Sequence, residues 1–576
     1  MNTRLINKTA GIGRVLFMGI FLLMAVTTLH AQEGKTLKGR VVDTTGEPIS
    51  GAVVNVSESS RIALSDVDGI FSLKDVYESD ELYLTAVGFV ETSVPVEFTD
   101  NFTVVMQTEV NDHSFTMPVP FARKENRFIT EATSVVTGEE LKKHPITVLQ
   151  NAFTSTVTGV STYEWASEPG WTESAMYIRG LRTMNRSARA PLVIVDNVER
   201  DLSFLDAYPI ENITILKDAA STAIYGMRGA NGAIMVTTKR GQAGKTKIDF
   251  TQEFGYQTLS DKMEVQNSYN MALTRNQVRY LSGNDPMYTS EQIEMYRKVS
   301  NGEQLEGIDQ YRYFNTNWFE ELYRERAPMN RTNLTVSGGN NNTRYFVAFT
   351  YLRHEGIWND KWTEYNPGFS TQHTLNRYNL RSNIDIDVNK YLNVSLDLGG
   401  RIDHISQPLR GVFDIVTFGA VEANPMEPVY TPGGQIYSSS TAQNAGRLLA
   451  SSGINQNRRR NIYSTVNLTG DLGDIVSGLK ANATVSFDSY ETFMAQQTNN
   501  VNSYNYNYTS KDVVDPSEYT LTQYSVYSAL TNPSTTPREY YYNVNTRFGL
   551  SYDRRFDKHA LNAQAFVRTY QNLTHG

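Results

Sequence analysis

The sequence predicts a mainly β protein: a small β-sandwich, then a mixed α/β domain, then antiparallel β-barrel strands through the second half. Three observations predict it. Short alternating runs separated by turn residues fill positions 36–108. Helical spacing and short strands are mixed between 131 and 241, and strands of about ten residues with strict alternation continue from 246 to 576.

The composition narrows the possible function classes. The chain has 576 residues, a formal net charge of −8 and no cysteine. An acidic chain without a basic run is a poor nucleic-acid binder, and the lack of cysteine excludes disulfides, iron–sulfur clusters and thiol catalysis. The eight histidines are scattered, and no zinc-protease or serine-hydrolase motif occurs. We therefore expect no enzyme, no metal site and no cofactor.

The first 31 residues predict a secretory signal peptide. The basic residues Arg4, Lys8 and Arg14 precede an apolar run from Val15 to Val26, and the small residue Ala31 follows that run. Such a run is too short for a membrane-spanning helix, which needs about 20 residues. An N-terminal membrane anchor is the alternative. Later segments are also too short, so a membrane protein of this sequence would have to be a β-barrel.

Residues 36–108 predict the β-sandwich, because short strands alternate with turn signals such as "TTGEP" and "DVDG". Asp66, Asp68 and Gly69 faintly resemble a calcium loop, but a hairpin turn is the favoured reading. Residues 109–130, with Pro118 and Pro120 and no clear period, indicate a linker.

Residues 131–241 predict the α/β domain. Helical spacing covers 138–160, and "AMYIRG", "APLVIVDN" and "ENITIL" are short strands. Asp218 can cap a short helix through Tyr225, with Gly226 as its left-handed exit. A phosphate loop has its glycines between a strand and a helix, whereas these glycines follow a helix and precede the strand "AIMVTT". The glycine-rich stretch is therefore not a nucleotide site.

Residues 246–576 predict barrel strands. Within 377–388, Leu380, Ile384 and Ile386 face one side, while Arg381, Asn383 and Asp385 face the other. The links between strands are alternately long and short, as in outer-membrane barrels, whereas a soluble sandwich has no reason for this asymmetry. The nine expected strands lie near 246–257, 331–338, 343–353, 377–388, 391–403, 461–472, 479–490, 540–554 and 559–570.

Nine strands do not close a bacterial barrel, which has an even number of strands, about 22 in plugged transporters. We therefore expect the first strands of a 22-stranded-type barrel, and an N-terminal portion of a longer protein.

The stretch "IENITILKDAAST" to "AIYGMRGANGAIMVTTKRG", with "MYIRG" and "PLVIVDN", resembles the plug signature of SusC-like (SusC/RagA type) TonB-dependent outer-membrane transporters. By this resemblance, 36–108 is similar to a carboxypeptidase-regulatory-like, transthyretin-type domain, 131–241 to the plug and 246–576 to a partial barrel. The signature residues are Arg179, Gly180, Asp196, Lys217, Asp218, Tyr225, Gly226, Arg228, Gly229, Asn231 and Gly232.

The resemblance implies import of oligosaccharides or peptides, energised by TonB, with a SusD-like surface lipoprotein as partner and outer-membrane lipid around the barrel. The TonB-binding segment should lie within 109–130, but Pro118 and Pro120 cannot donate backbone hydrogen bonds and no clean motif assigns it. The alternative function is a truncated, non-transporting outer-membrane protein with a binding or structural role.

Two hypotheses concern individual residues. The glycines 226, 229 and 232 could allow close approach of the plug to the barrel wall, and Arg228 and Lys217 could pair with lumen charges to lock the plug. Solvent-facing charges are the alternative. Two plug loops could contact substrate, with loop packing as the alternative. Their candidate residues are Trp165 and Trp171 for sugar rings, and Arg182, Arg186 and Arg189 for carboxylates or sulfates.

Overall fold

The computed structural model describes residues 34–575 except 44–45, 57–60, 79, 87–88, 90, 97, 100–101, 107–115, 126–128, 155, 165, 186–187, 261–263, 440–443, 509–516 and 557–558. The expected signal peptide (1–31) lies outside the described residues. The chain divides into two units, which are described separately. One comprises residues 1–117 and 123–129, the other residues 118–122 and 130–576.

The first unit contains a β-sandwich, as the sequence predicts. Alternate side chains such as Val41, Val54 and Leu82 are fully buried between its two sheets. One sheet has the order β4-β1-β7, and β1 pairs antiparallel with β4 and parallel with β7. Its strands are β1 (Lys35–Val42), β4 (Ile70–Val76) and β7 (Phe102–Val105). The other sheet is β3 (Ile62–Leu64), β2 (Val53–Val56), β5 (Glu81–Thr85) and β6 (Thr92–Pro95).

The stretch 66–69 forms a tight turn. The Asp66 carboxylate accepts hydrogen bonds from the backbone N–H groups of Asp68 at 3.0 Å and Ile70 at 2.8 Å, and Gly69 has a φ of 74°. The turn connects β3 to β4, which belong to different sheets, so the expected hairpin between paired strands is wrong in that detail.

The expected linker contains a β-hairpin that the sequence did not predict. Strands β8 (Thr116–Val119) and β9 (Ala122–Glu125) pair with each other. The Phe121 ring lies 4.9 Å from the Phe566 ring and 6.1 Å from the Tyr225 ring, and Gln564 donates a 3.2 Å hydrogen bond to the Phe121 carbonyl. Residues 109–115 and 126–128 of this segment lie outside the described residues.

The α/β domain of the second unit, hereafter the plug, is built on a five-stranded sheet of order β10-β15-β16-β13-β14. Ile213, Ile215 and Ile234 are fully buried in its main core. The predicted strands are confirmed as β12, β13, β15 and β16. Strand β11 pairs with β12 in a separate two-stranded ribbon. The bounds are β10 (Thr133–Thr137), β11 (Val160–Glu164), β12 (Ser174–Ile178), β13 (Leu192–Val195), β14 (Val198–Glu199), β15 (Ile210–Leu216) and β16 (Ala233–Thr238).

The plug helices are shorter than the sequence predicts. The helical spacing of 138–160 yields only α2 (Gly138–Lys142) and the 3-10 turn η2 (Leu149–Phe153), because Pro145 lacks an amide donor and disfavours helix at His144. Helix α3 (Ala219–Thr222) is capped by Asp218 but continues as the 3-10 segment η5 (Ala223–Gly229). A further 3-10 turn is η4 (Leu202–Phe204).

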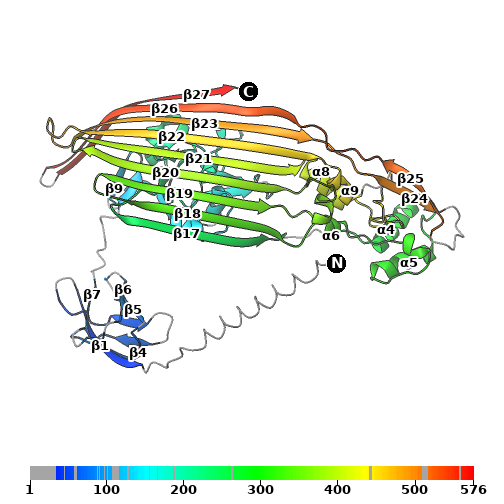
Figure 1. The fold of residues 1–576 in the computed structure, drawn as a ribbon, viewed down its shortest axis with the longest axis horizontal. Coiled ribbons are helices and arrows are strands. Elements are labelled where there is room, and N and C mark those ends of the chain that lie inside the picture. The colour runs from blue at the N-terminus through cyan, green and yellow to red at the C-terminus, as the bar shows by residue number, and fades with distance from the viewer. Residues whose placement is uncertain are drawn as a thin grey trace, which may run out of the picture. The chain divides into compact units, whose positions relative to one another are not determined.

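The nine predicted barrel strands are all present and form one antiparallel sheet in sequence order, with β17 and β27 at its edges (Figure 1). Leu380 is 51% exposed on the outer face, whereas Asn383 on the inner face is 0% exposed, as the alternation predicts. The bounds are β17 (Gly244–Gln257), β18 (Ala327–Gly339), β19 (Thr343–Glu355), β20 (Thr374–Asn389), β21 (Leu392–Pro408), β22 (Ile454–Asp471), β23 (Leu479–Gln497), β26 (Ser534–Phe556) and β27 (His559–His575).

The long connections lie at one end of this sheet and the short turns at the other, as expected (Figure 1). The long connections contain structure that the sequence did not predict, and Trp318, Trp358 and Trp362 pack in a shared core there. No helix among the described residues is long and apolar enough to cross a membrane. The elements are α4 (Ser268–Leu281), α5 (Ser290–Ser300), η6 (Asp309–Tyr311), α6 (Trp318–Leu322), α7 (Asp360–Thr363), α8 (Val412–Val416), η7 (Thr417–Val421), α9 (Ala445–Ala450), β24 (Ser503–Tyr508) and β25 (Tyr519–Ser525).

Candidate functional site

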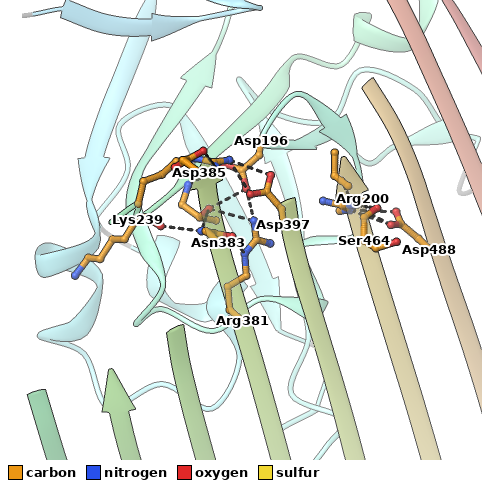
Figure 2. Close-up of polar contacts among 12 residues, drawn as sticks. Asp196, Arg200, Lys239, Arg381, Asn383, Asp385, Asp397, Ser464 and Asp488 are labelled. Carbon is orange, nitrogen blue, oxygen red and sulfur yellow. Dashed lines mark hydrogen bonds and ion pairs between the residues drawn. The ribbon is translucent and has the colours of Figure 1, made fainter. Parts of the chain in front are cut away.

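The end of plug strand β16 is hydrogen-bonded to the barrel wall through Asp196. This carboxylate lies in the β13–β14 turn and accepts from the Thr238 N–H at 3.0 Å, the Thr238 hydroxyl at 2.9 Å and the Arg381 guanidinium at 2.5 Å. Asn383 on β20 donates to the Thr238 hydroxyl at 2.9 Å and the Lys239 carbonyl at 2.7 Å (Figure 2). Burial alone would raise the pKa of Asp196, but the charges of Arg381 and Arg240 hold it below its usual value.

Arg240 extends this contact to the next barrel strand. Its guanidinium lies 2.9 Å from the Asp385 carboxylate on β20 and 2.9 Å from the Asp397 carboxylate on β21. Arg240 is the penultimate residue of the predicted plug and precedes β17 closely. The covalent junction between plug and barrel is thus reinforced by ion pairs.

A second contact joins the plug to β22 and β23 through Arg200, which is 7% exposed. The guanidinium donates to both oxygens of Asp488 at 2.9 to 3.2 Å and to the Thr465 hydroxyl at 2.7 Å (Figure 2). It also lies over the Tyr463 ring, 5.0 Å from the centroid. A planar cation with this many partners fixes the orientation of the plug as well as its position.

Nearer the long connections, barrel arginines bind plug carbonyls. Arg331 donates to the Ile146 carbonyl, and Arg377 donates to the Thr147 carbonyl at 2.5 Å. Arg377 is itself held by Asp403 at 2.9 Å. These bonds fix the plug segment around 146–147 against β18 and β20.

A cavity of about 640 Å³ lies between the plug and the long connections. Plug residues 145–172 contribute one side, and β17 with the following residues, Tyr323, residues 356–358, His373 and Val412 contribute the other. The volume is in the range of pockets that enclose a small-molecule ligand. This cavity is the candidate ligand site of the described residues.

The signature glycines pack inside the plug, so their expected role at the barrel wall is not seen. A Cβ on Gly232 would lie 2.8 Å from Ile178 Cδ1 and 3.0 Å from the Leu216 carbonyl oxygen, and one on Gly229 would lie 2.9 Å from Thr222. All these neighbours belong to the plug. A Cβ on Gly226 meets nothing within 4 Å, but its φ of 59° favours glycine.

Lys217 and Arg228 differ from the predicted lock. Lys217 donates to the Ser134 hydroxyl at 2.5 Å and the Thr158 carbonyl at 3.1 Å, both within the plug, so its partners among the described residues are not barrel charges. Arg228 pairs with Glu199 of the plug and stacks on Tyr570 of β27, 4.6 Å from the ring centroid. Its acidic partner is therefore in the plug, and only its ring contact reaches the barrel.

Glu199 also faces Arg568 of β27 at 3.6 Å. Burial raises the pKa of Glu199 even though both arginines oppose that rise. This carboxylate is consequently the acidic link between Arg228 and the last described strand.

The remaining signature residues shape the plug. Asp218 caps α3 by accepting from Ser221 N at 2.9 Å and also accepts from Ala132 N at 2.8 Å; the Ala132 bond, then the Ser221 bond, lowers its pKa. Burial raises the pKa of Tyr225 to about 12. The turn after β12 uses positive φ at Arg179 (56°) and Gly180 (84°).

The structure places the candidate substrate residues at different sites on the plug. Trp171 lies in the loop near the barrel wall, where its Nε1 donates to Gln407 at 2.7 Å and Arg459 stacks on its ring at 4.3 Å. Arg182 donates to the Ala230 carbonyl at 2.9 Å and lines a separate cavity of 260 Å³ with Lys217 and the glycines.

Arg189 donates to the Met184 carbonyl at 2.8 Å, and Asn231 donates to the Ala190 carbonyl at 3.3 Å. Of the five candidate substrate residues, Trp165 and Arg186 lie outside the described residues. None of the three described ones, Trp171, Arg182 and Arg189, lines the 640 Å³ cavity.

Of the strongest plug–wall residues, Asp196 belongs to the predicted signature, whereas its partners and the other contacts were not singled out from the sequence. Arg381, Asn383 and Asp385 were visible only as the polar face of a strand, and Asp488 likewise. Arg200 and Arg240 carried no local signal, because their partners are 145 to 288 residues away in sequence. The described residues contain no group of three or more His, Asp or Glu side chains suited to a metal ion.

Two families match the sequence. Residues 125–233 match the TonB-dependent Receptor Plug Domain, and residues 36–111 match the Carboxypeptidase regulatory-like domain. With barrel strands bound around the plug, these matches give the chain the domain composition of TonB-dependent receptors, which are β-barrel proteins of the outer membrane.

The curated relatives are TonB-dependent receptors, and one of them is SusC. The chain is 27% identical over 390 residues to TonB-dependent receptor P3 of Formosa agariphila, covering 67% of this chain and 34% of the relative. It is 28% identical over 356 residues to TonB-dependent receptor SusC of Bacteroides thetaiotaomicron, covering 60% and 32%. The chain therefore spans about a third of the length of these curated relatives.

The fold matches solved structures of the RagAB peptide transporter. The match has a TM-score of 0.56 at 18% identity and covers 77% of this chain and 48% of that chain. An open state of the RagAB peptide importer gives a TM-score of 0.56 at 16% identity, covering 79% and 56%. The chain is thus similar in sequence to SusC and another TonB-dependent receptor, and similar in fold to the RagAB structures.

Proposed function

We propose that the protein imports oligosaccharides or peptides across the outer membrane, energised by TonB and assisted by a SusD-like surface lipoprotein. The observation that carries this proposal is the polar attachment of the plug. Arg200, Arg240 and Asp196 bind the barrel wall through charged and hydrogen-bonded groups.

Such an interface suits a plug that must leave and return. When a buried ion pair separates into water, both partners regain hydration, which offsets much of the lost attraction. An apolar interface of the same area would expose hydrocarbon to water at about 25 cal/mol per Å². Import through the lumen requires this reversible displacement, whereas a structural protein does not.

TonB binding is proposed for the segment before the plug. TonB would add to an extended stretch within 109–130 by pairing backbone to backbone. Strands β8 and β9 already pair with each other, so this stretch either precedes the hairpin or becomes available when the hairpin opens. Force applied there reaches Phe121, which contacts both Tyr225 of the plug and Phe566 of the barrel.

The lipoprotein and the ligand are proposed from relatives. The similarity in sequence to SusC and in fold to the RagAB peptide transporter supports a two-component importer. The structured long connections of this chain, with the tryptophan-rich core around Trp362, offer the lipoprotein an ordered surface beside the candidate cavity.

A disulfide that ties the plug to the wall tests the proposal. A Cβ on Gly170 would lie 2.9 Å from Ile405 Cγ1 and 3.6 Å from its Cγ2, which puts two cysteine Cβ atoms within disulfide reach. The chain has no cysteine of its own, so Gly170→Cys with Ile405→Cys forms a single defined bond.

In cells with the intact proton gradient, we expect the oxidised double variant to lose uptake of labelled ligand and dithiothreitol to restore it. Each single variant is the matched control, because each carries the same local change, including the strain at Gly170, without the bond. Uptake that persists with the disulfide formed would contradict plug displacement. Ligand binding without uptake in the unmodified protein would favour the binding or structural alternative.

A further inference from the structure

The candidate cavity has an uneven charge composition. Among its described lining residues there is no lysine or arginine, whereas Glu164 and Glu168 both line it. Neighbouring arginines are already engaged: Arg324 is bound by Glu355 at 3.1 Å and Asp360 at 3.0 Å, and Arg377 by Asp403 at 2.9 Å. An anionic ligand would therefore meet two like charges and no described cation in the lining.

A buried histidine in the cavity wall offers a hydrogen-bond acceptor. His373 is 2% exposed, and its ring lies within hydrogen-bond reach of the Pro169 backbone. Burial, then the neighbouring His354, lowers the pKa of His373 to about 3, although the hydrogen bond to the Pro169 backbone opposes this. With its N–H directed at the Pro169 carbonyl, the neutral ring keeps one nitrogen that can accept a hydrogen bond from a hydroxyl group.

An aromatic shelf forms another part of the wall. Tyr323 stacks on Trp358 with ring centroids 5.3 Å apart and an interplanar angle of 14°, and Phe319 packs on Tyr323 at 5.3 Å. Tyr323 and Trp358 line the cavity together with Ile357 and Val412. Trp358 is only 3% exposed, so Tyr323 supplies the accessible part of this shelf, and an aromatic surface suits the apolar faces of sugar rings.

Glu168 lies close enough to Tyr323 for its charge to affect the Tyr323 hydroxyl. Burial, and then the charge of Glu168, raises the pKa of Tyr323 to about 12. The Tyr323 hydroxyl therefore stays protonated and able to donate. Glu164 is exposed and accepts from Asn151 at 3.2 Å. Hydroxyl or ammonium groups of a ligand can bind both carboxylates, whereas ligand carboxylate or sulfate groups are repelled.

We propose that this cavity takes a neutral or amine-bearing oligosaccharide and rejects its uronic-acid or sulfated counterparts. This inference rests on the proposed import function, for which it names the charge class of the ligand. It also replaces the sequence expectation of anionic ligands at Arg182 and Arg189, since neither side chain lines this cavity.

The test measures binding by calorimetry to the detergent-solubilised protein with matched tetrasaccharides. The probes are α- and β-1,4-linked glucose tetramers, the same tetramers oxidised to C6 carboxylates, and a glucosamine tetramer. We expect at least one neutral tetramer to bind, the glucosamine tetramer to bind at least as tightly as its neutral β-linked counterpart, and each carboxylate form to bind at least about ten-fold more weakly.

Variants connect this preference to the cavity. Glu164→Gln with Glu168→Gln should strengthen binding of the carboxylate forms about ten-fold and leave the neutral forms within about two-fold. His373→Ala should weaken the neutral forms without changing the ratio between neutral and anionic probes. Glu320→Gln, an exposed glutamate on α6 outside the cavity lining, is the matched control and should change nothing.

Several outcomes overturn the inference. These are equal or tighter binding of the carboxylate forms, binding of neutral tetrapeptides but of no tetrasaccharide, and no binding of any probe. Each leaves the proposed import function standing if the oxidised Gly170→Cys, Ile405→Cys protein still loses uptake. Conversely, the expected binding pattern with uptake unaffected by that disulfide removes the import function and keeps a binding site.

Discussion

Gly232 and Gly226 both have positive φ, at 87° and 59°, but their surroundings differ. A Cβ on Gly232 overlaps Ile178 and the Leu216 carbonyl, whereas one on Gly226 meets nothing within 4 Å. An L-residue costs about 1–2 kcal/mol in the left-handed region, and about 1–3 kcal/mol in the sparsely populated region where Gly226 lies with a ψ of −141°. Overpacking adds about 1–3 kcal/mol more, and only at Gly232.

We therefore expect Gly232→Ala to lower the free energy of unfolding by about 2–5 kcal/mol and Gly226→Ala by about 1–3 kcal/mol. Thermal unfolding midpoints of the two variants in the same detergent check the order. Gly411→Ala is a suitable control, since that glycine has neither positive φ nor a neighbour within 4 Å. If Gly226→Ala proves the more damaging, the close approach of Gly232 to Ile178 is not what makes glycine necessary.

Among the elements, the contact of the plug with β22 and β23 depends on one buried charge pair. Replacing Arg200 by Met leaves Asp488 buried without a partner, which costs about 3–5 kcal/mol. We expect the plug to become accessible to protease and the unfolding midpoint to fall. Arg200→Met with Asp488→Leu should recover most of the loss, because the lone charge is then gone.

The matched control for that pair is Arg297→Met. Arg297 pairs with Glu294 at 2.6 Å on the exposed surface of α5, where an ion pair contributes only about 0–1 kcal/mol. Equal losses in Arg200→Met and Arg297→Met would contradict an anchoring role for Arg200.

Helix α2 and the end of β16 are joined by Glu139, which accepts from Lys142 at 2.7 Å and from Lys239 at 2.9 Å. These bonds, Lys142 first and Lys239 second, lower the pKa of Glu139 from 4.5 to about 2. A carboxyl group whose pKa is lower in the folded than in the unfolded state stabilises the fold at pH values above its unfolded-state pKa. That stabilisation is lost as the pH falls through its folded-state pKa.

The difference in unfolding midpoint between the unmodified protein and Glu139→Gln should thus be constant above pH 4.5 and vanish near pH 2. Fluorimetric melting curves between pH 2 and 6 measure it. The difference should be small, because Glu139 is largely exposed. Glu140→Gln on the same helix is the comparison, and a difference that persists at pH 2 would rule out the assigned pairing.

The sequence predicted the elements unevenly, for physical reasons. The two-residue period of a strand fixes which side each residue faces, so Leu380 and Asn383 could be assigned to opposite faces from local pattern alone. The hairpin at 116–125 could not be predicted from local pattern, because its position depends on the contact between Phe121 and Phe566, which lies far along the chain. The polar strand faces were readable, but the pairing of Arg200 with Asp488 leaves no trace in either neighbourhood.

At the scale of the whole molecule, the nine-stranded sheet has two chemically different faces. The inner face carries the polar partners of the plug, and the outer face carries exposed apolar residues such as Leu380, Val388 and Ile462. In an outer-membrane protein the outer face contacts lipid, and the cost of a charge there depends on depth. Leu380 lies near the middle of β20 and Val388 near its short-turn end.

Arginine at Leu380 should therefore lower the free energy of unfolding by about 2–4 kcal/mol, and arginine at Val388 by only about 0–1 kcal/mol. Urea titrations of each variant in lipid vesicles, read by the shift in electrophoretic mobility on heating, measure both. Their exposed fractions are nearly equal, at 51% and 53%, so exposure alone predicts equal effects. Equal losses would mean that Leu380 lies no deeper in the membrane than Val388, whereas the expected ratio places Leu380, and with it the adjacent Arg381 and its plug partners, at mid-membrane.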